Sequence, residues 1–371
     1  MHDVLLADDL SGALDAAAAF RRSGREVVVA LQAAPWPVVP TGVLIAVNSE
    51  TRNDPPARAA AVIAEILAGL QRRGDRLVYK KIDSTLRGPV AAEITALAEA
   101  FPGSRILFAP ANPAVGRMVR GGVLCVHGVP VTETEYARDP VSPVCESDIR
   151  RLLAGAGGER VVIPDVENPG HLSAAVGAVV SAGGPWIAVG SGALARPVAE
   201  QLGGAGPTVA RRVEWPDAPP GPVLLVGGSA HALNQLQAAE LGRQRGVPVH
   251  TFRWSEPAIP LAATASDLRV KGGAALLVEA TRGDSRQVLR ALVAAVAELA
   301  RHVDGLKLFA TGGETAQALA GALGITTLTL GEEIEPGLSL ARAVSGRWLA
   351  IKPGGFGTPS TWVRAWDRLR G

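Results

Sequence analysis

Residues 77–88, LVYKKIDSTLRG, pass from an apolar run into a cluster of charged and hydroxyl side chains. Pro89 follows, and proline suits the first turn of a helix because its missing N–H leaves no helical hydrogen bond unmade. This order predicts a strand over 77–81 and a helix over 90–101. The polar cluster then lies at the carboxyl end of a strand, where open α/β sheets bind ligands.

The charges in this stretch are mixed. Two lysines, Lys80 and Lys81, and the guanidinium of Arg87 can hold an anion. The carboxylate of Asp83 can accept a proton from a hydroxyl. A solvated loop of salt bridges has the same composition, so the cluster alone leaves both interpretations open.

The length of 371 residues favours two domains, and 47% hydrophobic with 19% charged residues is typical of a soluble globular protein. Lys and Arg total 37 against 35 for Asp and Glu. So balanced a charge creates no global field, and we expect neither a nucleic acid nor an anionic membrane as partner.

Metal, disulfide and targeting signals are weak. Cys125 and Cys145 are too few for a disulfide framework or a zinc site, and the six histidines are scattered. We therefore expect no metal centre built from protein side chains. No apolar run approaches membrane-spanning length, and the acidic start of the chain does not resemble a signal peptide. The sequence predicts a cytoplasmic enzyme or binding protein.

The first half alternates predicted strands with predicted helices. The strands are expected at 2–7, 26–31, 43–47, 77–81, 105–108, 161–163 and 186–189, and the helices at 12–23, 55–73, 90–101, 170–182 and 193–202. Residues 116–122 and 128–143 predict irregular loops. The first of these carries Arg117 and Arg120, which are suited to clamp a carboxylate or phosphate or to lie in solvent.

Asp8 and Asp9 follow the first strand, and Ser11 is placed to cap the next helix. Adjacent aspartates point apart, which argues against a haloacid-dehalogenase-type phosphatase, whose Asp-x-Asp spacing puts two carboxylates beside a metal. One aspartate is explained by charge complementation of the helix N-terminus. Asp15, about one turn into the helix, joins the substrate-binding candidates.

Residues 190–195, GSGALA, fit the G-x-G-x-x-A pattern of a dinucleotide site. An NAD-linked dehydrogenase would also need an acidic ribose partner at the end of the next strand, and no convincing one follows. A tight strand-to-helix turn therefore explains these glycines better.

Residues 217–222, DAPPGP, predict a linker between two domains, 1–216 and 223–371. Strands of the second domain are expected at 223–226, 247–252, 274–279, 306–310, 326–330 and 348–351. The alternation with helices predicts an α/β fold of two domains, each a mostly parallel sheet flanked by helices.

Glycine-rich turns end three strands of the second domain, at 227–229, 311–315 and 352–357. Glycines let backbone N–H groups approach a phosphate, and the following helix favours the anion. The Walker pattern is absent. A polyphosphate groove is expected, with packing turns as the alternative.

Several stretches together resemble the four-carbon acid sugar kinases, which phosphorylate threonate, erythronate and oxo-tetronates with ATP. These are ADDLSGALDAA at 7–17, KKIDSTLRG at 80–88, PANPAVGR, GVPVTETEYARDP, GGS at 227–229, ATGGETA at 310–316 and KPGGFG at 352–357. The resemblance runs through nearly the whole chain. It implies that the first domain holds the sugar acid and the second holds the nucleotide.

The resemblance also implies site residues. The sugar-acid candidates that it implies are Asp9, Arg52, Lys81, Asp83 and Arg87, to which Asp15 is added from its place in the first helix. The ATP candidates are Ser229, Gly312, Gly313, Glu314, Thr315, Gly354 and Gly355. Two positions depart from the family pattern. Pro353 stands where a small polar residue is common and removes a backbone donor. Pro89 stands where asparagine is frequent, which bears on substrate choice.

The implied reaction is in-line transfer of the ATP γ-phosphoryl group to the terminal hydroxyl of the acid. Lys81 and Arg87 would grip the carboxylate or the moving phosphoryl group, and Asp83 or Asp9 would act as base, with Asp83 favoured. Mg²⁺ would be carried by the ATP phosphates. The alternative is a non-catalytic sensor of sugar acids or nucleotides on the same scaffold. The sequence is compatible with a homodimer.

Overall fold

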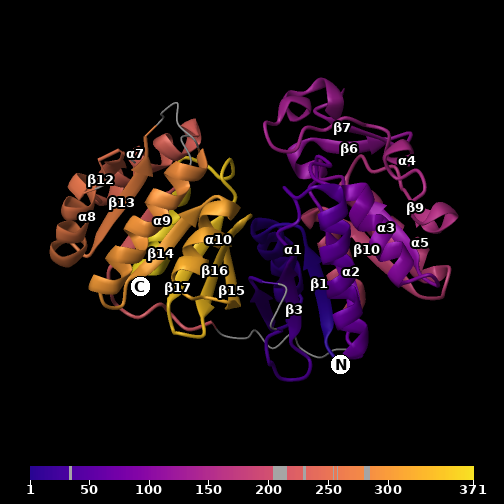
Figure 1. Ribbon diagram of the computed structural model, residues 1–371, viewed down its shortest axis with the longest axis horizontal. Coiled ribbons are helices and arrows are strands. Elements are labelled where there is room, and N and C mark those ends of the chain that lie inside the picture. The colour runs from indigo at the N-terminus through magenta and orange to yellow at the C-terminus, as the bar shows by residue number, and fades with distance from the viewer. Residues whose placement is uncertain (33–35, 204–214, 229–230, 254, 257, 280–284) are drawn as a thin grey trace. The chain divides into compact units, whose positions relative to one another are not determined.

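The computed structural model describes residues 1–32, 36–203, 215–228, 231–253, 255–256, 258–279 and 285–371. The chain divides into two compact units, Met1–Arg212 and Val213–Gly371. The first runs from indigo through magenta in Figure 1, and the second is mostly orange and yellow.

The first unit is built on a parallel sheet in the order β2-β3-β1-β4-β10-β5-β9. The strands are β1 (Asp3–Ala7), β2 (Val27–Ala30), β3 (Leu44–Asn48), β4 (Arg76–Lys81), β5 (Arg105–Ala109), β9 (Val161–Val162) and β10 (Trp186–Gly190). Every residue of β3 is buried, as expected for a parallel strand covered on both faces.

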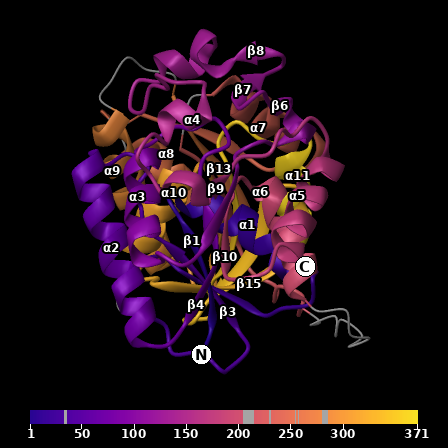
Figure 2. The same ribbon diagram turned by 90° about the vertical axis from the view of Figure 1, so that its right-hand side faces the viewer.

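Helices cover both faces of this sheet (Figure 2). On one face α2 (Pro56–Arg72) packs against α3 (Val90–Ala100), and on the other α6 (Gly192–Leu202) packs against α1 (Leu10–Arg22) and α5 (Pro169–Ser181). The predicted strand and helix positions agree with these elements to within a few residues. Helix α1 begins earlier than expected, because Asp9 caps it and not Ser11.

A small antiparallel sheet stands where loops were predicted. It consists of β6 (Arg117–Arg120), β7 (Val123–Val126) and β8 (Val129–Pro130). Gly121 and Gly122 have φ of 57° and 81°, as a two-residue hairpin turn between right-handed twisted strands requires. The loop prediction was wrong because this Gly-Gly pair marks a hairpin. The chain around and after this sheet forms short helices, which are η1 (Pro113–Val115), η2 (Val131–Glu133), η3 (Glu135–Arg138), α4 (Ile149–Leu152) and η4 (Gly158–Arg160).

The sheet of the second unit has the order β12-β13-β11-β14-β17-β16-β15. Its strands are β11 (Val223–Gly227), β12 (Val249–Phe252), β13 (Gly273–Val278), β14 (Lys307–Thr311), β15 (Thr327–Glu335), β16 (Leu338–Ala343) and β17 (Trp348–Lys352). The first five in spatial order are parallel, whereas β15, β16 and β17 are antiparallel neighbours. The sequence missed β16 because charged residues break the apolar pattern before it.

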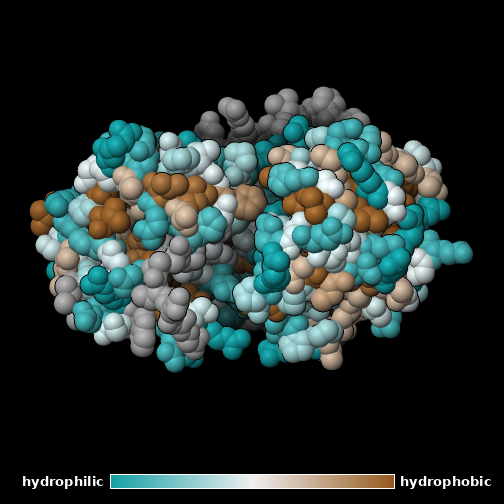
Figure 3. Space-filling model, turned by 90° about the horizontal axis from the view of Figure 1, so that it is seen from above, coloured by the Kyte–Doolittle hydropathy of each residue, from teal (hydrophilic) through white to brown (hydrophobic). Residues whose placement is uncertain are grey.

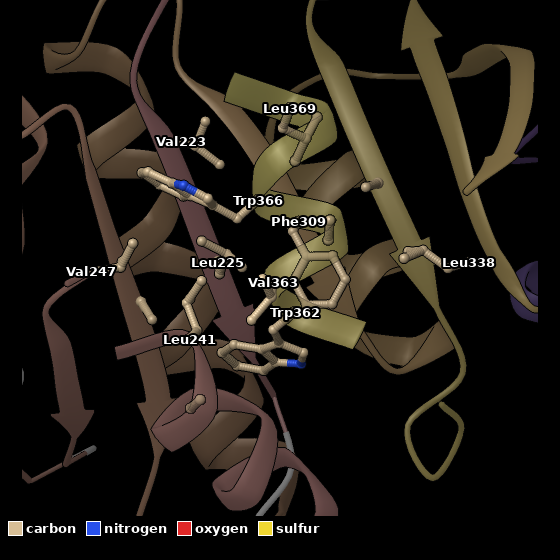
Figure 4. Packing of buried hydrophobic residues seen from close by; sticks show 14 of the residues in the cluster. Val223, Leu225, Leu241, Val247, Phe309, Leu338, Trp362, Val363, Trp366 and Leu369 are labelled. Carbon is tan, nitrogen blue, oxygen red and sulfur yellow. The ribbon is translucent and has the colours of Figure 1, made fainter. Parts of the chain in front are cut away.

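The helices of this unit lie in two layers. One layer holds α8 (Ala258–Val270), α9 (Ser285–His302) and α10 (Gly313–Ala322), and the other holds α7 (Ala232–Arg245) and α11 (Thr361–Arg370). Figure 4 shows Trp362 and Trp366 of α11 in the apolar core. The ring of Trp362 meets that of Phe309 of β14 edge-on, with centroids 5.3 Å apart. Such aromatic pairs stabilise a fold beyond what the burial of their apolar surface contributes.

Apolar residues on the face drawn in Figure 3 lie in small groups between polar ones. Among the helices of the described ranges, none combines the length and hydrophobicity needed to cross a bilayer.

Candidate active site

Neighbouring strands of the first unit bring together the residues that were predicted to bind a sugar acid. In the register of the sheet, Ala7 at the end of β1 pairs with Asn48 of β3 and with Lys81 of β4. The segments that follow these strands carry Asp8 and Asp9, Arg52, and residues 82–87. Parallel strands end at one edge, so the sheet order brings together residues that are far apart in the sequence.

Arg52 is the centre of the charge network. Its guanidinium donates to Asp8 at 2.9 and 2.8 Å, pairs with Asp9 at 2.6 Å and lies 3.9 Å from Asp83. Burial opposes the charge of Arg52, but the carboxylates of Asp8 and Asp9 outweigh it and raise its pKa well above the ordinary value. Arg52 therefore neutralises the aspartates of the site.

Asp83 is held by hydrogen bonds on both oxygens. Arg87 donates from Nε to Oδ2 and from Nη2 to Oδ1, both at 3.0 Å, and Thr85 donates from its N–H at 3.1 Å and from its hydroxyl. Burial opposes ionisation of Asp83, but Arg52 and Arg87 outweigh it and hold the pKa of its carboxyl far below the usual range. So stabilised a carboxylate is a weak proton acceptor and a firm anchor for Arg87.

Asp9 is the more accessible of the two predicted bases. Its side chain is 20% exposed, against 8% for Asp83. Its Oδ1 accepts from the N–H of Gly12 at 2.9 Å and caps α1, while its Oδ2 accepts the hydroxyl of Ser11. A hydroxyl can rotate away, so Oδ2 can become available to a substrate.

Lys81 lies over the first turn of α1. Its Nζ donates to the carbonyl of Ile82 at 3.1 Å, and a Cβ added to Gly12 would come within 2.9 Å of Nζ. Asp15 lies one turn further along α1, and its carboxyl group packs against Gly192. Burial raises the pKa of Asp15, and the charge of Lys81 opposes the rise.

Gly190 and Gly192 are required by close packing. A Cβ on Gly192 would lie 2.5 Å from the carboxyl carbon of Asp15, and a Cβ on Gly190 would lie 3.1 Å from the carbonyl carbon of Ala109. These close approaches account for the glycine pattern without a dinucleotide.

Lys80 is separate from the anion-binding group in which the sequence had placed it. Successive side chains of a strand point to opposite faces, so Lys80 points away from Lys81. Its buried Nζ pairs with Glu93 of α3 at 2.7 Å, and Glu93 also accepts the hydroxyl of Thr51. This buried pair, which sequence reasoning missed, joins β4, α3 and the segment that carries Arg52.

Of the two loop arginines, Arg117 reaches the site and Arg120 does not. Arg117 donates to the hydroxyl of Ser84 and, at 3.1 Å, to that of Tyr136, whereas Arg120 pairs with Glu167 and is 58% exposed. Arg87 and Arg117 each lie 5.6 Å from the Tyr136 ring centroid. A pocket of about 310 Å³ lies beside them, lined by Val115, Arg117, Val126, His127, Val129, Glu133, Thr134, Glu135 and Tyr136. The sequence did not single out Tyr136.

Glycine turns of the second unit converge at one edge of its sheet. A Cβ on Gly228 would lie 2.7 Å from Thr315 Cβ, one on Gly354 would lie 4.0 Å from Gly312 Cα, and one on Gly355 would lie 3.6 Å from His231 Nε2. The backbone segments after β11, β14 and β17 are therefore neighbours. Gly312 has φ of 100°, which favours glycine. Ser229 lies outside the described residues.

The predicted nucleotide residues of α10 occupy its first turn. Gly313 and Glu314 begin the helix, and Thr315 is buried against Gly228. Backbone N–H groups at such a helix start suit phosphate oxygens. No group of three or more side chains suited to a metal occurs within the described ranges.

Comparisons with known proteins agree with the division into two parts. Residues 4–161 match the model of a sugar-binding N-terminal domain, and residues 224–362 match that of a nucleotide-binding C-terminal domain. A D-threonate kinase from Cupriavidus necator is 34% identical over an alignment covering 100% of this chain and 98% of that protein. The chain belongs to the four-carbon acid sugar kinase family.

Other members of the four-carbon acid sugar kinase family differ in their named substrate. A 3-oxo-tetronate kinase from Salmonella typhimurium is 26% identical over 97% of each chain. A D-erythronate kinase from Heliobacterium modesticaldum is 32% identical over 41% of this chain and 35% of that protein.

Solved structures share the fold. A Salmonella typhimurium protein matches with a TM-score of 0.80, 23% identity and 98% coverage of each chain. A Bordetella bronchiseptica protein matches with a TM-score of 0.51, 32% identity, and coverage of 100% of this chain and 99% of that one. That protein is described as a domain-swapped dimer with bound citrate.

Proposed function

We propose that this protein is an ATP-dependent kinase that phosphorylates the terminal hydroxyl of a four-carbon sugar acid of the threonate, erythronate or oxo-tetronate type. The observation that carries the proposal is the pair of sites just described. One unit gathers cations and aspartates at one sheet edge, and the other gathers glycine turns with backbone donors. The names of the family members supply the substrate class.

We propose that the unit Met1–Arg212 holds the acid. Lys81 and Arg87 supply positive charge for its carboxylate or for the moving phosphoryl group, and Asp83 fixes the guanidinium of Arg87. Arg117 approaches the same stretch through Ser84 and adds a further cation. Hydroxyl groups of the acid find acceptors in Asp9 and Asp15.

We assign the proton acceptor to Asp9. The new bond forms between the terminal hydroxyl oxygen and the γ-phosphorus, the bond from that phosphorus to the β–γ bridging oxygen breaks, and the hydroxyl proton passes to Asp9 Oδ2. ADP carries away the negative charge of the bridging oxygen. Such transfers depend on positioning and charge stabilisation more than on a strong base. The hydrogen bonds that engage Asp83 support this assignment.

We propose that the unit Val213–Gly371 holds ATP on its three glycine turns. Gly312, Gly313, Glu314, Thr315, Gly354 and Gly355 line the site, with Ser229 retained from the family pattern. Backbone N–H groups and the start of α10 receive the phosphates. Mg²⁺ bound to the phosphates would neutralise part of their charge, with Glu314 as a contact through water. Because the reaction uses ATP, we place it in the cytoplasm.

Two further points of the proposal can be tested separately. A non-catalytic sensor would bind acid and nucleotide without turnover, so single-turnover transfer of labelled phosphate separates it from a kinase. The homodimer stays a proposal, supported by the dimeric description of the Bordetella bronchiseptica relative. Light scattering during gel filtration measures the mass that decides it.

The deciding experiment measures ADP release from MgATP with D- and L-threonate, D- and L-erythronate and 3-oxo-tetronates. We expect turnover that depends on one of these acids, with phosphate on its terminal hydroxyl by ³¹P NMR. ATP binding without stimulation by any acid would contradict the proposed substrate class and favour the sensor.

A further inference from the structure

Lys352 lies beneath the turn 353–357 at the end of β17. Its side chain is almost wholly buried, with 1% of the residue exposed. Nζ donates to the carbonyl of Pro353 at 3.0 Å, to that of Gly354 at 2.9 Å, and to Oδ1 of Asn234 at 3.5 Å. A buried ammonium thus fastens two successive carbonyls of the glycine turn to the sheet.

These contacts set the direction of two backbone donors. In a trans peptide the C=O and the N–H point to opposite sides of the chain. The carbonyls of Pro353 and Gly354 point to Lys352, so the N–H groups of Gly354 and Gly355 point away from it. Neither N–H finds a hydrogen-bond partner among the residues that the structure describes.

We propose that Lys352 is a positioning residue of the nucleotide site, whose buried ammonium holds the turn so that the N–H groups of Gly354 and Gly355 face the ATP phosphates. The inference rests on the proposed ATP site and names a residue outside the predicted set. Lys352 acts here through the backbone, and the phosphates contact the glycines.

The charge of Lys352 matters because of the acceptors around it. An ammonium offers three N–H donors, one for each of its three oxygen neighbours, whereas a neutral amine offers only two. A neutral amine would leave one of these three oxygens without a donor and would hold the other two by weaker hydrogen bonds, so the turn could relax by rotating a peptide. Rotation would turn an oxygen, in place of an N–H, toward a phosphate.

The surroundings set where Lys352 titrates. Burial lowers the pKa of Lys352 to about 8, and the carboxylate of Glu335 opposes that shift. Glu335 on β15 is itself paired with Arg364 of α11. His231 lies beside Gly355 at the start of α7, while α7 and β14 contribute the uncharged Asn234 and Thr311. We therefore expect the ammonium to be lost as the pH rises through about 8.

Calorimetric binding of MgATP, MgADP and adenosine to the full chain tests the inference. We expect Lys352→Met to weaken MgATP and MgADP about 100-fold at pH 7, because two hydrogen bonds to a charged group are lost, and to leave adenosine nearly unchanged. Lys307→Met is the matched control. Lys307 is also a buried lysine of this sheet, but it begins β14, at the opposite strand end from the turns, and its Nζ donates to the carbonyl of Pro219.

A pH series gives a readout that a general structural defect would not produce. Wild-type affinity for MgATP should fall about tenfold per pH unit above the midpoint, because each unit leaves a tenth of the ammonium. Asn234→Asp places a carboxylate beside Nζ and should move that midpoint upward.

The possible outcomes distinguish a failure of the role proposed for Lys352 from a failure of the proposed ATP-dependent function. Equal MgATP affinity in Lys352→Met and wild type, or a wild-type affinity that is flat from pH 7 to about 9.5, would overturn the inference alone, since titration of Lys352 spans this interval. No MgATP binding in the wild type would overturn the proposed function as well. If Lys352→Met does not fold, the wild-type pH series and Asn234→Asp still decide.

Discussion

Asp9 and Asp83 carry the same functional group in different surroundings, and amide substitution should separate their roles. In Asp83→Asn an NH₂ group would face one of the donors of Arg87, so Arg87 loses one hydrogen bond to a carboxylate and keeps its pair with Asp139 at 3.3 Å. We expect the KM for the acid to rise by about tenfold, in proportion to one lost charge-assisted hydrogen bond. In Asp9→Asn the proton acceptor is lost, and we expect kcat to fall by about 100-fold.

Steady-state kinetics with saturating MgATP measures both parameters. Circular dichroism on each variant verifies that it is folded. A fall in kcat confined to Asp83→Asn, with Asp9→Asn active, would return the role of base to Asp83.

At the scale of elements, the Lys80–Glu93 pair links β4 to α3 in the interior of the first unit. Glu93→Gln would leave the fully buried ammonium of Lys80 without its counter-charge. Removing one partner of a buried pair usually costs about 3–5 kcal/mol, and we expect the free energy of unfolding to fall by this amount in urea titration.

The double variant Lys80→Met with Glu93→Leu should recover most of that loss, because it removes both charges and fills the space with apolar groups. Glu200→Gln serves as the control. Its pair with Arg196 is 58% and 75% exposed, so the change should be under about 1 kcal/mol. A loss in Glu93→Gln no larger than the control would contradict the role given to this pair.

At the scale of the whole molecule, the proposal assigns one ligand to each unit. Hydrogen exchange measured by mass spectrometry should show MgADP protecting the turns at 227–228, 311–315 and 352–357. The acid should protect residues 8–12, 51–52 and 81–87. Binding slows exchange where it stabilises a local structure against opening.

Each ligand is added alone and then both together. Lys352→Met is the control for MgADP. At an MgADP concentration near the wild-type Kd, this variant should lose protection at the turns, whereas protection by the acid should be unchanged. Protection of the first unit by MgADP alone, or of the glycine turns by the acid alone, would contradict the division of ligands.

Local patterns in the sequence determined much of this protein. Alternation of apolar strands with amphipathic helices predicts parallel sheets, because each element carries its own periodicity. Glycine and proline mark the turns. Asp83, Arg87 and the glycine motifs can be recognised in the sequence because they directly follow predicted strands. The hairpin at β6 and β7, the strand β16, the cap of α1 and the place of Lys80 were misjudged.

The tertiary structure decided which side chains meet. Strand order places Arg52 against Asp8 and Asp9, and it places Asp15 in the space left by Gly192. It also sends Lys80 to Glu93 and seats Lys352 beneath two carbonyls. These contacts join residues that lie from about a dozen to well over a hundred positions apart, or depend on the direction of single peptide groups. Local periodicity carries no information about either, because both are set by how the elements pack.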